Sequence, residues 1–231
     1  MELTCPAGTP VAFRDAVDAG ADAVQCGFAD ETNASHFMAL HFTRDELAEA
    51  IAYAHARGTR VAVAVDSFMR AGAEALWTRA GDTAVALGAD AVVVADIGLL
   101  AYVAETYPAQ RRHLAVQLAA ATVPHIAFLV EAFGIQRAVL PRGLLVEEVV
   151  QIAREAACEI EVAAGGVIVR RPNGPRPGPS LDMLGHLREL ASAGVTAVKV
   201  EDAPRGCAYV RGLIADIRAA DAADAADERA A

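Results

Sequence analysis

The stretch Asp22-Ala-Val-Gln-Cys-Gly-Phe-Ala-Asp-Glu-Thr-Asn-Ala-Ser-His-Phe37 shows the unit from which the chain is built. It begins with a short apolar segment, Ala23–Cys26, which predicts a buried strand that breaks at Gly27. The loop that follows is rich in hydrogen-bonding side chains and closes on Phe37. Parallel α/β enzymes carry their chemistry in such loops, at the carboxyl ends of the strands. The stretch therefore predicts an α/β fold with a site where the strands end.

Strand-like and helix-like segments alternate along the rest of the chain. Strands are expected at Glu2–Cys5, Ala23–Cys26, Arg60–Val65, Ala91–Ala95, Leu114–Val116, Ala138–Leu140, Glu159–Ala163 and Ala197–Val200. Helices are expected at Pro10–Ala19, Thr43–Arg57, Ala73–Leu87, Leu99–Tyr107, Pro124–Phe133, Leu145–Ala157, Leu181–Ser192 and Ala208–Ala219. This alternation predicts a (β/α)8 TIM-like barrel, a single domain over residues 1–219. An open doubly wound sheet is the alternative, although no G-x-G-x-x-G follows the first strand.

Two segments depart from the repeat. Residues 165–180 include Arg170-Arg-Pro-Asn-Gly-Pro-Arg-Pro-Gly-Pro179, a loop that neither a helix nor a central strand can cross. Its arginines could clamp an anion, but a solvated loop is the simpler interpretation. Residues 220–231 form an Ala/Asp-rich tail that we expect to be disordered.

Composition narrows the classes of function. The 231 residues carry a net charge of −10, which argues against a general nucleic-acid binder or a protein of anionic membrane surfaces. No apolar run is long enough to span a membrane, and the start Met-Glu-Leu-Thr-Cys-Pro resembles no secretory signal. The four cysteines are scattered, so free thiols in a cytoplasmic protein are expected.

In a barrel, the polar residues that end the strands would converge on one mouth. These residues are Asp66, Asp96, Gln117, Arg142 and Glu201, with Lys199 on the last strand and Asn33 and His36 in the second-strand loop. Because buried charges are costly unless they are paired or used, their recurrence at strand ends favours a functional site. The alternative is that they are loop-holding caps and salt bridges.

Several chemistries are compatible with this set. Asp66, Asp96, Glu201 and His36 could form an oxygen-rich metal site, but no H-x-H or H-E-x-x-H spacing supports one, and no metal is predicted. Lys199 could form a Schiff base, although a pair with Glu201 is the simpler arrangement. Arg142 suits bidentate binding of a carboxylate. No serine elbow, P-loop or catalytic Cys/His pattern is present.

The chain resembles peptidase family U32 and, within it, the bacterial UbiU-type proteins of oxygen-independent ubiquinone biosynthesis. The resemblance rests on Glu2-Leu-x-Cys-Pro-Ala-Gly8, Gly20-Ala-Asp-Ala-Val24, Thr32-Asn-Ala-x-His-Phe37, Phe42-Thr43, Ala95-Asp-Ile97, Val116-Gln117, Val139-Leu-Pro-Arg142, Val198-Lys-Val-Glu201 and Ala208-Tyr-Val210. It implies a barrel, and hydroxylation of ubiquinone precursors, tRNA or ribosomal RNA rather than peptide cleavage. It also implies prephenate as an oxygen source and an iron–sulfur cluster held by four cysteines.

The sequence departs from this family pattern in two ways. The long cysteine-bearing segment of such relatives is replaced by Gly165–Pro179, which contains no cysteine, and Cys5, Cys26, Cys158 and Cys207 do not match the cluster positions. Pocket positions also differ: Ser35 stands where the resemblance implies Arg, Asp66 where it implies Asn, and Ala119 and Thr122 where it implies Ser and Asn. We therefore expect no cofactor, and in particular no iron–sulfur cluster.

The sequence thus predicts a cluster-free enzyme that acts on a small anionic, prephenate-like or aromatic metabolite. The predicted binding residues are Asn33, Phe37, Gln117 and Arg142, and the predicted catalytic residues are Lys199, Glu201, His36, Asp66 and Asp96. The alternative is a non-catalytic partner subunit of a cluster-bearing U32 relative, and a peptidase is the third hypothesis.

Overall fold

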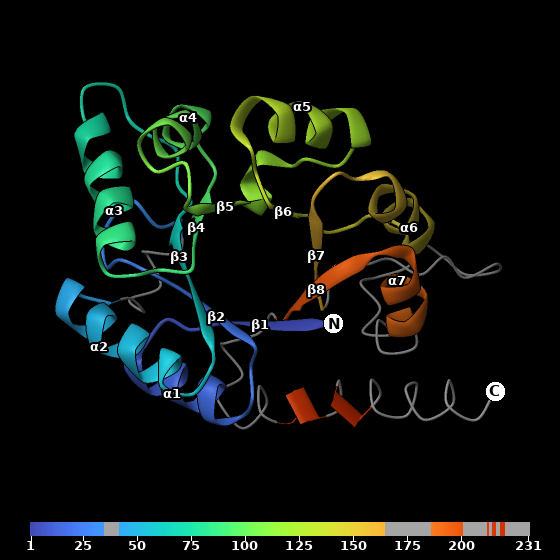
Figure 1. Cartoon of the computed structure of the whole chain (residues 1–231), viewed down its shortest axis with the longest axis horizontal. Coiled ribbons are helices and arrows are strands. Elements are labelled where there is room, and N and C mark those ends of the chain that lie inside the picture. The colour runs from blue at the N-terminus through green and yellow to red at the C-terminus, as the bar shows by residue number, and fades with distance from the viewer. Residues whose placement is uncertain (35–41, 165–185, 201–211, 213, 216–217, 220–231) are drawn as a thin grey trace.

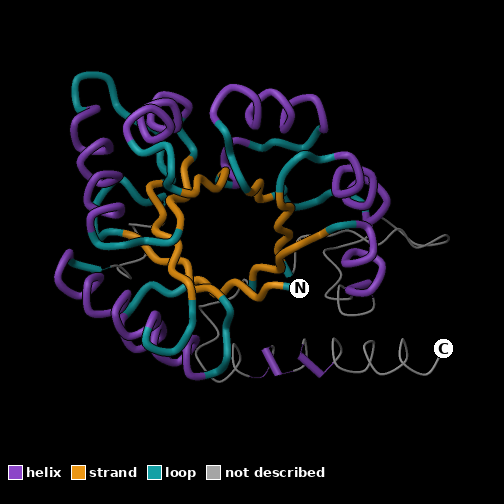
Figure 2. Tube along the Cα trace, in the orientation of Figure 1, coloured by secondary structure: helices purple, strands orange, loops and turns teal. Residues whose placement is uncertain are grey.

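A computed structural model describes residues 1–34, 42–164, 186–200, 212, 214, 215, 218 and 219. Its centre is a closed barrel of parallel strands in chain order. The strands are β1 (Glu2–Pro6), β2 (Ala23–Gly27), β3 (Arg60–Val65), β4 (Ala91–Val94), β5 (Arg111–Leu114), β6 (Arg137–Val139), β7 (Glu159–Ala163) and β8 (Val195–Lys199). β8 pairs with β1 and closes the ring, which Figure 2 shows from one end. The predicted TIM-like barrel is confirmed, and the open-sheet alternative is wrong.

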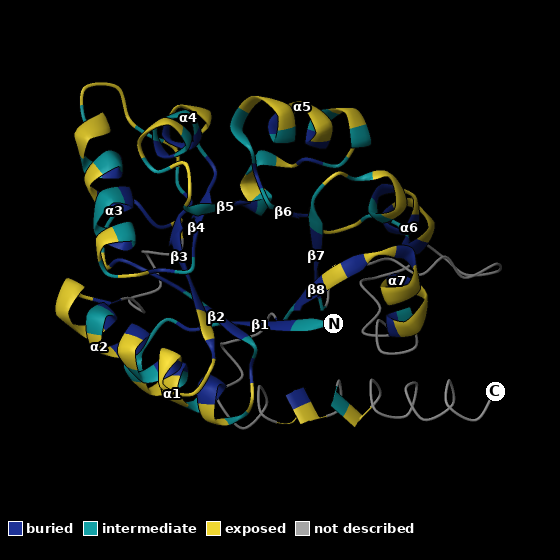
Figure 3. Ribbon diagram, in the orientation of Figure 1, coloured by how far each residue is buried: buried dark blue, intermediate teal, exposed yellow. Residues whose placement is uncertain are grey.

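Helices surround this ring and cover its outer face (Figure 1). They are α1 (Pro10–Asp18), α2 (Arg44–His55), α3 (Glu74–Ala86), α4 (Ile97–Thr106), α5 (Val123–Phe133), α6 (Val146–Glu155) and α7 (Leu187–Ala193). The strands are largely buried, whereas each helix has one buried and one exposed face (Figure 3). Within the described residues, no helix is long and apolar enough to cross a membrane.

Helix starts follow local sequence. A capping box begins α2: the Thr43 N–H donates to Glu46 Oε2 at 2.9 Å, and the Glu46 N–H donates to Thr43 Oγ1 at 3.3 Å. Thr9 and Thr122 cap α1 and α5 through the side-chain oxygen alone, which accepts a backbone N–H of the first turn, and each of these helices has a proline in that turn.

The prediction for the fifth strand is wrong. Leu114–Val116 was expected, but β5 is Arg111–Leu114, and Val116–Leu118 forms the 3-10 turn η2. The charged residues of β5 resemble a loop, yet each has a fixed partner. Arg112 points out of the barrel and donates to five backbone carbonyls, which are those of Tyr107, Pro108, Gln110, Phe133 and Gly134. Tertiary partners therefore allow a polar segment to form a strand.

The apolar core has two parts of unequal size. The larger one fills the space between strands and helices and includes Phe13, Phe42 and Trp77. The smaller one lies inside the barrel and consists of Ala62, Ala64, Ala91, Val93, Ala95 and Ala115. Because these residues come only from β3, β4 and the β5 end, the opposite wall of the barrel is left for polar side chains.

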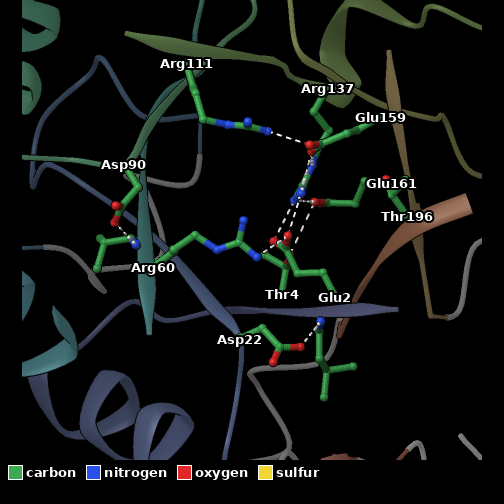
Figure 4. Close-up of polar contacts among 12 residues, drawn as sticks. Glu2, Thr4, Asp22, Arg60, Asp90, Arg111, Arg137, Glu159, Glu161 and Thr196 are labelled. Atoms are coloured by element: carbon green, nitrogen blue, oxygen red, sulfur yellow. Dashed lines mark hydrogen bonds and ion pairs between the residues drawn. The ribbon is translucent and has the colours of Figure 1, made fainter. Parts of the chain in front are cut away.

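Charged residues gather near the amino ends of the strands, here called the lower end of the barrel, and four of the six come from that opposite wall, on β1, β6 and β7. This lower-end cluster comprises Glu2, Arg60, Arg111, Arg137, Glu159 and Glu161 (Figure 4). Its centre is Arg137, whose side chain is 3% exposed and which lies 2.6 Å from Glu2 Oε2, 2.7 Å from Glu159 Oε2 and 3.0 Å from Glu161 Oε2. A buried guanidinium in contact with three carboxylates is compensated, which is the condition for keeping such charges in a core.

His113 lies beside this cluster and supplies a pH-dependent prediction. Burial, with the charges of Arg137 and Arg111, lowers the pKa of His113 to about 3, against the opposing pull of Glu159 and Glu2. The unfolded chain takes up this proton below about pH 6.5, whereas the folded protein does not until about pH 3. Stability therefore falls as pH drops through this window, because the unfolded state binds more protons.

We expect this histidine to remove about 1–2 kcal/mol of unfolding free energy between about pH 6.5 and pH 5. His113→Gln should lose that part of the pH slope, as measured by urea unfolding at several pH values. The window lies above the titration of Glu2 and Glu159, whose pKa values are lowered from 4.5. Parallel curves for wild type and His113→Gln would contradict the prediction.

Candidate functional site

Asp66 lies at the centre of the described part of the barrel mouth. It follows β3 directly and is buried, with 7% of its surface exposed. Its Oδ1 accepts a hydrogen bond from the Ala34 N–H at 2.8 Å, and its Oδ2 accepts one from Gln117 Nε2 at 3.1 Å. One carboxylate thus joins the β2 loop, the end of β3 and η2. Two of the predicted site residues, Asp66 and Gln117, are in direct contact.

Asn33, a third predicted residue, is held at the same place by Gly27. Asn33 is buried, and its Nδ2 lies 1.9 Å from where a Cβ on Gly27 would be. Gly27 ends β2, so the absence of a side chain lets Asn33 pack against the inner strand wall. The break at Gly27 in the sequence therefore has a packing reason.

The β2 and β3 loops are also joined behind the mouth. Ser67 Oγ donates to the Glu31 carbonyl at 2.5 Å and accepts from Trp77 Nε1 at 2.9 Å. The Ser67 N–H donates to the Thr32 carbonyl at 3.2 Å. These bonds tie both loops to α3, so the polar groups at the mouth rest on a rigid support.

Lys199 enters the barrel from the end of β8. It is half-buried, and its Nζ donates to Gln25 Oε1 at 2.9 Å. An amide oxygen accepts this bond without neutralising the ammonium. Among the described residues, no carboxylate forms an ion pair with Lys199. Gln25 was not predicted as a site residue, although it is the one polar residue in the apolar strand segment Ala23–Cys26.

Asp96, another predicted site residue, has a different role from Asp66. The Asp96 carboxylate accepts from the N–H groups of Gly98 (2.8 Å), Leu99 (3.1 Å) and Met69 (3.1 Å), so it caps α4 and holds the β3 loop. Arg142 is exposed in the loop between β6 and α6. His36, Phe37 and Glu201 lie outside the described residues, as do the Gly165–Pro179 loop and the tail.

The described cysteines do not fit an iron–sulfur cluster. Cys5 and Cys26 are part of the apolar core between strands and helices, and burial raises the pKa of each thiol to about 12. Burial likewise raises the pKa of Cys158, which precedes β7, to about 11. Cluster ligands must be thiolates. In the described part of the chain, no group of three His, Cys, Asp or Glu residues is placed to hold a metal ion.

Residues 8–170 match the family described as Peptidase family U32. The chain belongs to this family. A curated relative of this U32 chain is tRNA hydroxylation protein P of Escherichia coli K12, 31% identical over 168 residues. A second is the uncharacterized protease MJ0090 of Methanocaldococcus jannaschii, 33% identical over 100 residues.

These alignments cover unequal shares of the proteins compared. The first spans 72% of this U32 chain and 36% of the relative, and the second spans 43% of this chain and 24% of the relative. The chain thus corresponds to about a third of one relative and a quarter of the other.

Solved structures support the same fold. The U32 peptidase Mk0906 superposes with a TM-score of 0.62 at 19% identity, over 87% of this chain and 93% of that chain. Dihydrodipicolinate synthase from Agrobacterium tumefaciens gives 0.59 at 16% identity, over 99% and 78%. At such identities the likeness concerns the barrel alone.

Proposed function

We propose that this U32 barrel binds a small anionic metabolite at its carboxyl-terminal mouth and acts in a hydroxylation-related reaction. The observation that supports this proposal best is the set of polar side chains at the mouth. There, Asp66 fixes Gln117 and the β2 loop, and Lys199 extends into the barrel without a described carboxylate partner. An ammonium whose bond among the described residues is to a neutral amide is available to an anion. The relative named for tRNA hydroxylation supports the reaction class.

The residues divide into groups that bind and groups that position. Lys199 and Arg142 would attract carboxylates of the ligand, while Asn33 and Gln117 would orient its polar groups. Asp66 would hold Gln117 in place, and Asp96 would keep the β3 and β4 loops together. His36 and Glu201 would move protons, and Phe37 would contact an aromatic ring. A prephenate-like molecule, anionic and cyclic, matches this set.

No cluster-dependent step is assigned to this chain, because its described thiols are protonated and point away from the mouth. Direct binding of tRNA is also not part of the proposal. A net charge of −10 favours a small anion in a local cationic pocket over a polyanion on the surface.

Calorimetry with prephenate on the full chain tests the proposal. We expect saturable binding, and Lys199→Met should weaken it at least about tenfold, because the lost charge contact is worth about 1.4 kcal/mol or more. Arg60→Met, which removes a cation at the opposite end of the barrel, serves as the matched control and should bind like wild type. An absence of binding, or equal weakening by both variants, would sink the proposal.

Asp66 offers a sharper test of how the mouth is built. Asp66→Asn should keep both bonds, because the new amide can still accept from the Ala34 N–H while Gln117 rotates its own amide to accept. Asp66→Ala loses both and should cost about 1–2 kcal/mol of unfolding free energy. Prephenate affinity should follow the same order. If Asp66→Asn abolishes turnover with unchanged stability, the carboxylate is catalytic instead of positioning.

A partner-subunit function is the second candidate, because Cys5 and Cys26 are buried core thiols that do not fit an iron–sulfur cluster. In that case the barrel would dock on a cluster-bearing U32 protein that supplies the missing chemistry. Co-expression followed by tandem purification would show a complex with the visible absorbance of iron–sulfur clusters. Recovery of this chain alone, with prephenate binding intact, would favour the enzyme.

A further inference from the structure

A small, partly open cavity lies inside the lower half of the barrel, between the lower-end cluster and the mouth. Its volume is about 30 Å³. Several polar residues contribute to its lining, among them Thr4, Gln25, His113, Arg137 and Glu161. Val93, on the opposite wall, closes the cavity with an apolar surface.

Two polar atoms at this cavity have no protein partner. His113 Nε2 and Glu161 Oε1 are both fully enclosed and make no hydrogen bond among the described residues. The residues are 8% and 2% exposed. The other oxygen of Glu161 accepts from Arg137 Nη1 at 3.0 Å and from Thr4 Oγ1 at 3.3 Å. A buried polar atom without a hydrogen-bond partner destabilises the fold, so both atoms require an occupant of the cavity.

We propose that this cavity is a hydration site, in which one or two buried water molecules bridge His113 Nε2 and Glu161 Oε1. The volume suits this occupant, since a buried water needs roughly 10–15 Å³ of such space and two to four polar partners. A water can donate to the carboxylate and either donate to or accept from the imidazole. It therefore fits both tautomers of a neutral histidine.

Charge disfavours a cation in the same place. Glu2, Glu159 and Glu161 are matched by Arg60, Arg111 and Arg137 through the ion pairs of the lower-end cluster. A further positive ion would lie beside Arg137, and the remaining carboxylate in the lining, Asp90, is already bonded to His55 and to the Val61 N–H. A neutral occupant satisfies the two atoms without disturbing this balance.

The water also reaches toward the mouth through Gln25. This side chain lines the cavity, and its Oε1 is already used by Lys199. Its amide nitrogen is then left to donate, and a water in the cavity can accept from it. The lower-end cluster would thereby fix the amide orientation that positions Lys199. This site does not depend on which ligand the mouth binds.

A crystal structure of the full chain at about 1.2 Å resolution tests the proposal. We expect either one density peak within about 3.2 Å of both His113 Nε2 and Glu161 Oε1, or two peaks that contact each other and lie within about 3.2 Å of one atom each. An empty cavity, or a direct bond between His113 and Glu161, would overturn it. A second crystal soaked in rubidium chloride tests the cation, since an anomalous peak in the cavity would exclude water as the natural occupant.

Magnetic relaxation dispersion provides a second measurement in solution by counting long-lived internal waters. His113→Phe should fill the cavity and lower this count by one or two relative to wild type. Glu161→Gln keeps the shape and an acceptor oxygen, so it should leave the count unchanged. An unchanged count in His113→Phe would contradict the proposal. If His113→Phe does not fold, the wild-type crystal decides.

Discussion

Replacing Arg137 by methionine is expected to lower the free energy of unfolding by about 3–5 kcal/mol at pH 7. The side chain is 3% exposed and contacts Glu2 on β1 and Glu159 and Glu161 on β7. Burial alone would raise the pKa of Glu2, but the hydrogen bond and charge of Arg137 outweigh it and lower this pKa. Without Arg137, the buried carboxylates would lose the charge that compensates them.

Urea unfolding of wild type and Arg137→Met measures this effect, and Arg60→Met is the matched control. Arg60 contacts the same Glu2 at 2.7 Å, but its side chain is 50% exposed, so its loss should cost under about 1 kcal/mol. Adding Glu161→Gln to Arg137→Met should recover part of the loss, because one uncompensated charge disappears. Similar costs for Arg137→Met and Arg60→Met would show that burial does not govern this cluster.

The lower-end cluster was not predicted, and the reason is physical. Alternation along a strand tells which residues face inward, but not which residues meet across the barrel. Glu2 and Arg137 are separated by 135 positions and belong to strands that are not neighbours. The misplaced fifth strand has the same cause, since Arg111 and Arg112 favour a strand only once their distant partners, Glu159 for Arg111 and the Phe133 and Gly134 carbonyls for Arg112, are known.

Much of the rest followed from local sequence. Short apolar or alternating segments located the first four strands, the sixth and the seventh to within a residue, and the helix predicted from Thr43 begins at Arg44. Strand-end positions also placed Asp66, Gln117 and Lys199 at one mouth. Strand-end positions did not distinguish the roles of these residues. Asp96, like Asp66, follows a predicted strand, yet it caps a helix. That difference depends on which backbone N–H groups surround each carboxylate.

Replacing Gly27 by valine is expected to damage fold and site together. A Cβ at this position would lie 1.9 Å from Asn33 Nδ2 and 3.1 Å from the Ala64 carbonyl oxygen. Asn33 would have to leave the mouth, and the β3 backbone would be crowded. We expect a loss of about 2–3 kcal/mol in unfolding free energy, in the range of overpacked cores. Prephenate affinity should fall by more than the tenfold expected for Lys199→Met, because Asn33 and the loop held by Asp66 would both shift.

Gly81→Ala separates this steric effect from the general cost of replacing a buried glycine. Gly81 lies within α3, and a Cβ there would meet Val103 and Leu99 at 3.6 and 3.8 Å, which is ordinary contact. Alanine should therefore stabilise the helix by about 0.5–1 kcal/mol and leave ligand binding unchanged. Urea unfolding and calorimetry on both variants give the comparison. If Gly27→Val binds prephenate as well as Gly81→Ala does, the packing of Asn33 on Gly27 does not shape the mouth.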